Sequence, residues 1–129
     1  MARILIADDE VHITLVLEYN LRRAGYETLV ANDGAMALKM ANEHAPDLIV
    51  TDYQMPYMDG LEFASRLSDN PMTEHIPVIM LTARGHRVDP TEIGKTNIRH
   101  LLDKPFSPRG FIETVEQLLA DGSSRENAA

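Results

Sequence analysis

The chain has 129 residues, 44% hydrophobic and 25% charged, which is the composition of one globular domain with its own core. Its formal net charge of −8 argues against nucleic acid as the main partner, because contacts to phosphate depend on lysine and arginine. The chain has no cysteine, so disulfides and thiolate metal sites are excluded and a reducing cytoplasm suits it.

The start of the chain does not read as a targeting segment. The apolar run at residues 4–7 is too short for a signal peptide, and acidic residues follow it at once. No apolar run approaches the roughly 20 residues of a membrane span. We therefore expect a cytoplasmic location and no membrane contact.

Short apolar segments alternate with segments whose apolar residues recur three and four positions apart, which predicts strands and helices in turn. The predicted elements, in chain order, are a strand at 2–7, a helix at 11–24, a strand at 26–31, a helix at 35–44, a strand at 48–51, a helix at 61–69, a strand at 78–82, a short helix at 90–96, a strand at 98–102 and a helix at 108–120. We expect one domain over residues 1–120, followed by a polar, flexible tail at 121–129.

Several residues mark the ends of these elements. Gly25 suits the left-handed position after the first helix. Asp89, with Glu92 three residues later, has the spacing of a helix cap, and Asn97 suits a left-handed position after that short helix. Ser107–Pro108 predicts an N-cap followed by proline at the first helical position.

Five alternations of strand and helix predict a doubly wound α/β fold, with a parallel five-stranded sheet between two layers of helices. The strands are apolar without alternation, which fits burial on both faces. In the flavodoxin-like strand order 2-1-3-4-5, the functional crevice lies at the carboxyl ends of strands 1 and 3.

Polar residues follow the strands at that edge. Asp8 and Asp9 end the first strand, Asp52 the third, Thr82 the fourth and Lys104 the fifth. Three carboxylates beside one lysine leave excess negative charge, and oxygen donors without cysteine favour Mg²⁺. The alternative is that the acids after the first strand merely cap the following helix, whose N-terminus negative charge stabilises. That alternative does not explain Asp52, Thr82 and Lys104.

The segments ILIADDE, TDYQMPYMDG, LTA and KPF, in this order and spacing, resemble the receiver domain of two-component response regulators over residues 2–120. The resemblance implies the CheY-like form of the flavodoxin-like fold. It also implies that Asp52 accepts a phosphoryl group. Asp9, Asp52 and the backbone carbonyl of Gln54 would bind Mg²⁺ directly, and Asp8 would do so through water.

The same resemblance assigns residues on the far side of the site. Thr82, Ala83 and Lys104 would contact or flank the phosphoryl oxygens, and the Lys104–Pro105 peptide bond would be cis. The chain departs from the family at Leu101, where an aromatic residue usually reports phosphorylation, and at 97–98, where glycine and alanine are usual. We expect Thr82 and Leu101 to form a weakly biased switch.

A carboxylate can attack phosphorus and form an acyl phosphate. We therefore expect a phosphoacceptor signalling domain that catalyses only its own phosphorylation and slow dephosphorylation. The expected partner is a sensor histidine kinase or a histidine phosphotransfer protein. Two alternatives stay open, a magnesium-dependent phosphohydrolase with an aspartate nucleophile and a binding module that uses no phosphate.

Residues 84–104 have a net charge of +2 in a chain of net charge −8. We expect a downstream effector of acidic character to dock on this face and on the last helix, drawn by charge. An ordinary solvated surface is the alternative. The basic residues of this segment are Arg84, Arg87, Lys95, Arg99 and Lys104.

Overall fold

Strands and helices alternate along the chain in the predicted order. The computed structural model describes residues 1–83 and 87–128. Its elements are β1 (Arg3–Ala7), α1 (Val11–Arg23), β2 (Glu27–Ala31), α2 (Gly34–His44), β3 (Leu48–Asp52), α3 (Gly60–Ser68), β4 (Val78–Ala83), α4 (Pro90–Gly94), β5 (Ile98–Lys104) and α5 (Pro108–Ala128).

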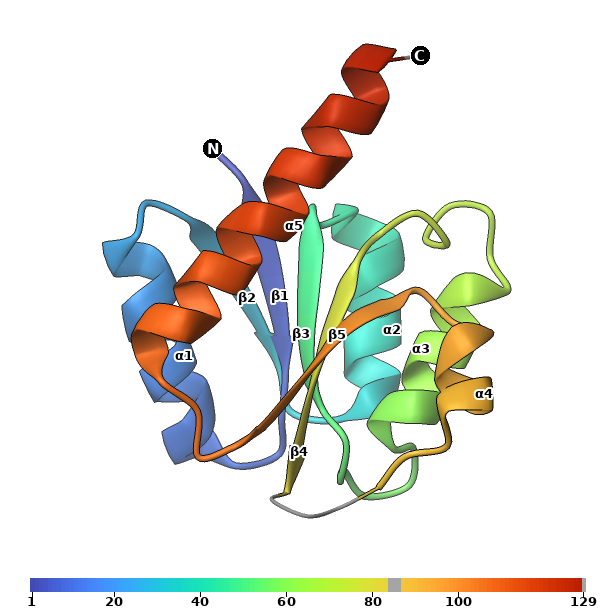
Figure 1. Cartoon of the computed structure of the whole chain (residues 1–129). Coiled ribbons are helices and arrows are strands. Elements are labelled where there is room, and N and C mark those ends of the chain that lie inside the picture. The colour runs from blue at the N-terminus through green and yellow to red at the C-terminus, as the bar shows by residue number, and fades with distance from the viewer. Residues whose placement is uncertain (84–86, 129) are drawn as a thin grey trace.

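The five strands form one parallel sheet in the order β2-β1-β3-β4-β5. This confirms the predicted strand order and the doubly wound α/β class. In Figure 1, α1 and α5 cover one face of the sheet, and α2, α3 and α4 cover the other. The order reverses between β1 and β3, so their carboxyl ends flank the crevice expected in this class of fold.

Alternate strand side chains supply two hydrophobic clusters, one on each face of the sheet. In β1, Leu5 and Ala7 pack in the cluster beneath α2 and α3, whereas Ile4 and Ile6 pack beneath α1 and α5. All five residues of β3 are buried. Burial on both faces explains why the strand sequences are apolar runs rather than alternations.

Three predicted helix boundaries are confirmed. Gly25 follows α1 with a φ of 99°, in the left-handed region that glycine adopts without strain. The Asp89 side chain caps α4 by accepting from the backbone N–H of Thr91 at 2.9 Å, although Glu92 pairs with Lys95 instead of completing a reciprocal cap. Ser107 Oγ accepts from the N–H at the start of α5.

The prediction for Asn97 was wrong. Its φ is not positive; within the described residues the non-glycine positions with positive φ are Ala45 and Tyr57. Asn97 is instead buried, and its Nδ2 donates to the carbonyl of Ile76 at 2.6 Å. Its backbone N–H donates to Ser68 Oγ at 2.9 Å. Tertiary hydrogen bonds therefore decide its conformation, and a local pattern does not contain them.

Seven elements end at different residues from those predicted, six of them by one or two residues. β3 reaches Asp52 and β5 reaches Lys104, so both charged residues belong to strands, while α4 already ends at Gly94. The helical conformation of α5 continues to Ala128, beyond the expected end at residue 120. The periodic apolar residues from which this helix was predicted end with Leu119. A polar helical end carries no such apolar stripe, so the pattern did not predict it. The flexibility of residues 121–129 stays a prediction.

Across residues 1–83 and 87–128, no helix combines the length and the apolar character that crossing a bilayer requires.

Replacing Asn97 with alanine should lower the free energy of unfolding by about 1–3 kcal/mol, because the buried carbonyl of Ile76 and the hydroxyl of Ser68 would lose their bonds to the Asn97 side chain. Urea denaturation followed by circular dichroism measures this. The control is Asn42→Ala on the exposed surface of α2, where we expect a change within about 0.5 kcal/mol. Equal losses in the two variants would contradict a structural role for Asn97.

Candidate functional site

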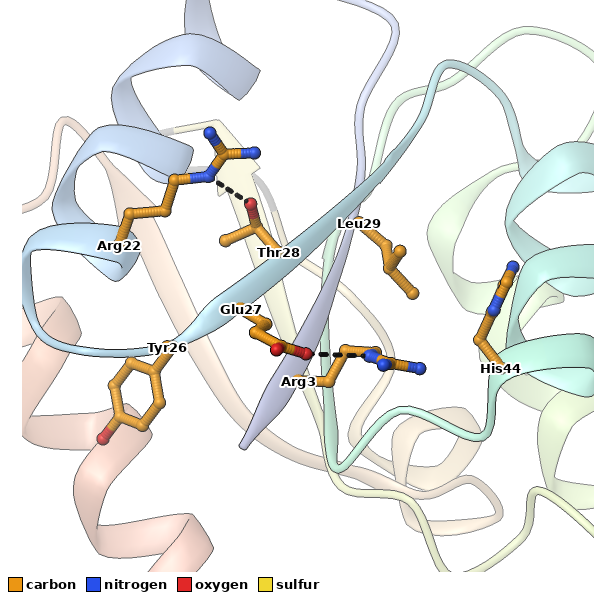
Figure 2. Close-up of a pocket in the computed structure, with 7 residues that line it drawn as sticks. All are labelled: Arg3, Arg22, Tyr26, Glu27, Thr28, Leu29 and His44. Atoms are coloured by element: carbon orange, nitrogen blue, oxygen red, sulfur yellow. Dashed lines mark hydrogen bonds and ion pairs between the residues drawn. The ribbon is translucent and has the colours of Figure 1, made fainter. Parts of the chain in front are cut away.

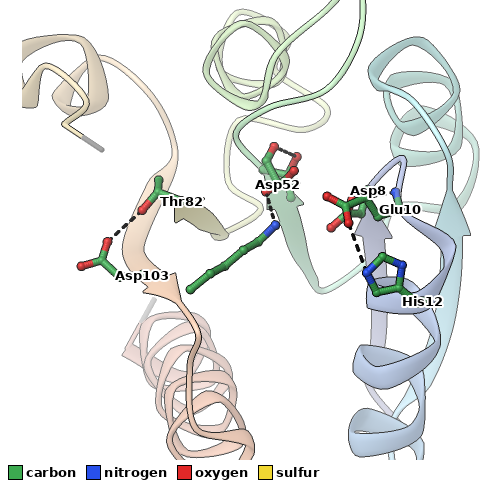
Figure 3. A network of polar contacts seen from close by, with 8 residues as sticks. Asp8, Glu10, His12, Asp52, Thr82 and Asp103 are labelled. Carbon is green, nitrogen blue, oxygen red and sulfur yellow. Dashed lines mark hydrogen bonds and ion pairs between the residues drawn. The ribbon is translucent and has the colours of Figure 1, made fainter. Parts of the chain in front are cut away.

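The polar residues predicted to gather at one edge of the sheet do so. Asp8 follows β1, Asp52 ends β3, Thr82 is the penultimate residue of β4, and Lys104 ends β5. Parallel strands place all these ends at the same edge. Figure 3 shows Asp8 and Asp52 at neighbouring strand ends, with Thr82 beyond Asp52.

Three carboxylates form a close cluster. Asp8, Asp9 and Asp52 each offer an oxygen, and these oxygens lie within 4.8 Å of one another. Asp8 and Asp52 are buried, with 1% and 5% exposure, whereas Asp9 is exposed. Like charges at this separation repel strongly when they are removed from water. The cluster therefore requires positive charge.

The first acids do not act as side-chain caps of α1. Glu10 occupies the N-cap position, but its side chain makes no cap hydrogen bond. Asp8 Oδ1 accepts from the backbone N–H of Glu10 at 2.9 Å, while Asp8 Oδ2 is buried without a hydrogen-bond partner among the described residues. A buried carboxylate oxygen left without a partner is costly, so this geometry favours a ligand role over a capping role.

Lys104 supplies one compensating charge. Its Nζ lies 2.9 Å from Asp52 Oδ1, and both side chains are largely withdrawn from solvent. This contact joins the last strand of the sheet to the central strand across β4. A charge-assisted bond of this length fixes the acceptor oxygen of Asp52 in place.

The pKa values of the site residues indicate that positive charge does not fully balance the carboxylates. Burial raises the pKa of Asp8 to about 6, and the charges of Asp52 and Asp9 add to the effect. Burial also raises the pKa of Asp52, although Lys104 opposes it. Burial alone would lower the pKa of Lys104, but the surrounding carboxylates outweigh it and raise the pKa. Each shift favours the protonated form, so Lys104 alone does not balance the acids.

These observations fit a divalent cation. The donor set consists of carboxylate oxygens, which suit Mg²⁺, and the orphaned oxygen of Asp8 lies in the cluster. Gln54 is two residues beyond Asp52 in the loop that follows β3, with an exposed side chain. Its backbone carbonyl is the fourth predicted ligand, and its role stays a prediction.

The loop after β3 is held tightly against the end of that strand. A Cβ atom at Gly60 would lie 2.4 Å from the carbonyl oxygen of Asp52, so no side chain fits there. The backbone N–H of Gly60 donates to the carbonyl of Tyr53 at 2.8 Å. Asp59 caps α3 by accepting from the N–H of Glu62 at 2.8 Å.

The switch residues lie at the end of β4 and on β5. Thr82 is buried, and its hydroxyl donates to Asp103 Oδ1 at 2.9 Å (Figure 3). Ala83 is exposed beside it, and Leu101 is 39% exposed. The peptide bond between Lys104 and Pro105 is cis, the isomer that the resemblance implied. The phosphoryl-contacting and switching roles stay predictions.

Sequence reasoning missed two residues. Asp103 stands in register with Thr82 on the neighbouring strand, and an acidic residue just before Lys104 at a strand end was the signal that could have identified it. His12 lies 3.2 Å from Glu10 at the exposed rim of the acidic cluster. Neither contact follows from spacing along the chain, because both depend on side-chain direction.

A separate hollow lies along the edge strand β2 (Figure 2). Its two arginines are already engaged, Arg3 with Glu27 at 3.3 Å and Arg22 with Thr28 at 2.9 Å. Arg3 and Glu27 are the first residues of β1 and β2, so this hollow lies at the opposite end of the strands from Asp52. It does not contribute to the acidic site.

Comparison with known proteins identifies a consistent group. The model of the response regulator receiver domain matches residues 4–116. The chain is 38% identical over 117 residues to the alkaline phosphatase synthesis transcriptional regulatory protein PhoP of Bacillus subtilis, covering 91% of this chain but 48% of PhoP. It is 37% identical to the polar-differentiation response regulator DivK of Brucella anthropi, covering 91% of this chain and 94% of DivK.

A solved structure of the Vibrio cholerae chemotaxis protein CheY4 has the same fold. It superposes with a TM-score of 0.85 at 31% identity, over 92% of this chain and 98% of CheY4. This confirms the CheY-like form of the fold. The chain spans about half of PhoP but nearly all of DivK and CheY4.

Asp8→Asn should raise the free energy of unfolding of the metal-free protein at pH 7.5 by about 1–3 kcal/mol, because it removes a buried charge that lacks a cation. The amide can still accept from the N–H of Glu10. Urea denaturation in the presence of a chelator measures the change, with exposed Asp9→Asn as the control.

Saturating Mg²⁺ should reduce or reverse the difference in free energy of unfolding between Asp8→Asn and the parent, because the cation binds and stabilises the folded parent. A destabilised Asp8→Asn in the chelator would show that the carboxylate is already balanced within the protein. In that case the cation site would be wrongly assigned.

Proposed function

The chain belongs to the response regulator receiver domain family, and from that premise we propose that Asp52 accepts a phosphoryl group from a phosphohistidine of a partner protein. The observation that supports Asp52 is its setting. Its carboxylate is buried at the end of β3, bonded to Lys104 at 2.9 Å and clustered with Asp8 and Asp9. Membership of this family supports a role for the proposed chemistry in two-component signalling.

The proposed transfer is an in-line displacement. A carboxylate oxygen of Asp52 forms a new bond to phosphorus while the bond between phosphorus and the histidine nitrogen breaks. The electron pair of the broken bond stays on the imidazole, and Asp52 becomes an acyl phosphate. Lys104, now 2.9 Å from Asp52 Oδ1, is placed to donate to a phosphoryl oxygen once that carboxylate oxygen reacts.

Asp8, Asp9, Asp52 and the backbone carbonyl of Gln54 would hold Mg²⁺. When bound, the cation neutralises the charge that gathers on the transferring oxygens. The Asp8 oxygen without a partner and the raised pKa of Asp52 both support this assignment. Thr82 would donate its hydroxyl to a second phosphoryl oxygen, while Ala83 is too small to cover the entrance.

Incubation with Mg²⁺ and acetyl phosphate should add one phosphoryl group to the chain, and Asp52→Asn should abolish the addition. Intact-mass spectrometry measures both results. The control is Asp69→Asn at the far end of α3, which should be modified to the parent extent. Equal modification of the Asp52→Asn variant would show that another residue is the acceptor.

The same sample separates the switch from the phosphohydrolase alternative. A signalling domain should release its own phosphate slowly, once per modification. Sustained release of many phosphates from a model phosphomonoester would support the hydrolase instead. Stable phosphate-free binding of a partner by Asp52→Asn at parent affinity would support the binding module.

We also propose that the described part of the 84–104 segment receives an acidic effector. Arg87 precedes α4, Lys95 directly follows it and Arg99 lies on β5, and all three are exposed. Lys95 Nζ lies 3.5 Å from Glu92 Oε1 in an exposed ion pair. A carboxylate of the partner can replace Glu92 there at little cost in free energy. Arg84 and His86, which belong to the same prediction, lie outside the described residues.

Reversing Arg87, Lys95 and Arg99 to glutamate should lower the association rate with an effector captured on the phosphorylated chain by about tenfold at low salt. The salt dependence should flatten, and phosphorylation of Asp52 should be unchanged. Surface plasmon resonance across a salt series measures the rates. The control reverses Arg23, Lys39 and Arg66, which are exposed on α1, α2 and α3. Parent kinetics in the test variant would place the output surface elsewhere.

A further inference from the structure

Asp103 makes a contact that the proposed transfer does not use. It stands in register with Thr82 on the adjacent parallel strand, and its Oδ1 accepts from the Thr82 hydroxyl at 2.9 Å. Thr82 is buried, whereas Asp103 is exposed on the edge strand of the sheet. In Figure 3 the Thr82 hydroxyl points toward Asp103 and away from Asp52.

The bond from the Thr82 hydroxyl to Asp103 excludes a second bond donated by the same hydroxyl. A threonine hydroxyl has one proton to donate, so it cannot serve Asp103 and a phosphoryl oxygen at the same time. The bond to a carboxylate is also stronger than a bond between neutral groups. The resting protein therefore contains a competitor for the hydroxyl that the phosphorylated state requires.

The neighbour of Asp103 on the same face of β5 cannot hydrogen-bond to Thr82. Leu101 lies two residues earlier on the same strand and therefore on the same face as Asp103. It is 39% exposed and has no hydrogen-bonding group, so it cannot hold Thr82 in either position. Within the described residues, Asp103 is thus the residue on this face of β5 whose side chain hydrogen-bonds to Thr82.

We propose that Asp103 is a positioning residue that retains Thr82 in the resting conformation, and that phosphorylation of Asp52 switches the domain by drawing the hydroxyl away from it. This inference rests on the proposed function of Asp52. Once Thr82 leaves, the Asp103 carboxylate loses its donor on the exposed edge of β5. The chemical change at Asp52 then becomes a change in hydrogen bonding at the surface.

The test measures binding of beryllium fluoride, an analogue of the phosphoryl group, to the Mg²⁺-loaded full chain. Asp103→Ala should tighten binding by about tenfold, because the analogue no longer competes for the hydroxyl. Asp103→Asn keeps a neutral acceptor and should give a smaller gain. Isothermal titration calorimetry supplies the dissociation constants.

A second background separates this competition from simple repulsion. Thr82→Val keeps the shape of the side chain and removes the hydroxyl, so Asp103→Ala should change the affinity of that variant by less than about twofold. A tenfold gain in both backgrounds would show that Asp103 acts only through its charge, and would overturn the proposal.

Nuclear magnetic resonance supplies a readout that general destabilisation does not move. Three-bond couplings to the Thr82 methyl group report its χ1 rotamer in the free protein. The parent should occupy one rotamer, and Asp103→Ala should shift the population toward that of the beryllium fluoride complex. An unchanged rotamer population in Asp103→Ala would contradict the proposal.

The outcomes also distinguish the two levels of inference. If the parent fails to bind beryllium fluoride in Mg²⁺, the proposed phosphoacceptor function itself is wrong. If the parent binds it and Asp103→Ala binds it with the same affinity, only the role of Asp103 is wrong.

Discussion

The structure depends on the ion pair between Lys104 and Asp52, because that contact makes the burial of an acidic cluster tolerable. It spans from the edge strand β5 to the central strand β3. Burial raises the pKa of Asp8 and of Asp52, and the mutual repulsion of three carboxylates that face one ammonium group adds to the effect. The resting site is therefore incompletely neutralised, and this residual charge makes it receptive to a cation.

Strand geometry divides the site between the two faces of the sheet. Asp52 lies on the same face of the sheet as Val50, and Lys104 on the same face as Leu102. Val50 and Leu102 both pack in the cluster beneath α1 and α5. Thr82 shares the side of Met80, in the cluster beneath α2 and α3. The ion pair of Asp52 with Lys104 and the hydroxyl of Thr82 thus start from opposite faces of the sheet, and they come together at its carboxyl edge.

The sequence was sufficient for whatever follows from strand order alone. Parallel strands end at one edge, so Asp8, Asp52 and Lys104 could be brought together without coordinates. The contacts of Asn97 and Asp103 could not be derived, because they are hydrogen bonds to residues 21 positions away along the chain. Polar side chains with tertiary partners leave no periodic signal, and this limits prediction from a single sequence.

The contact between Gly60 and Asp52 has a consequence for how this domain can vary. Any side chain at Gly60 would collide with the backbone of Asp52, whereas Tyr57 in the same loop is fully exposed. Substitutions at the loop tip leave the Asp52 backbone in place, but a substitution at Gly60 must move it. A library of loop variants made to alter partner choice should therefore keep Gly60 fixed and diversify the exposed tip.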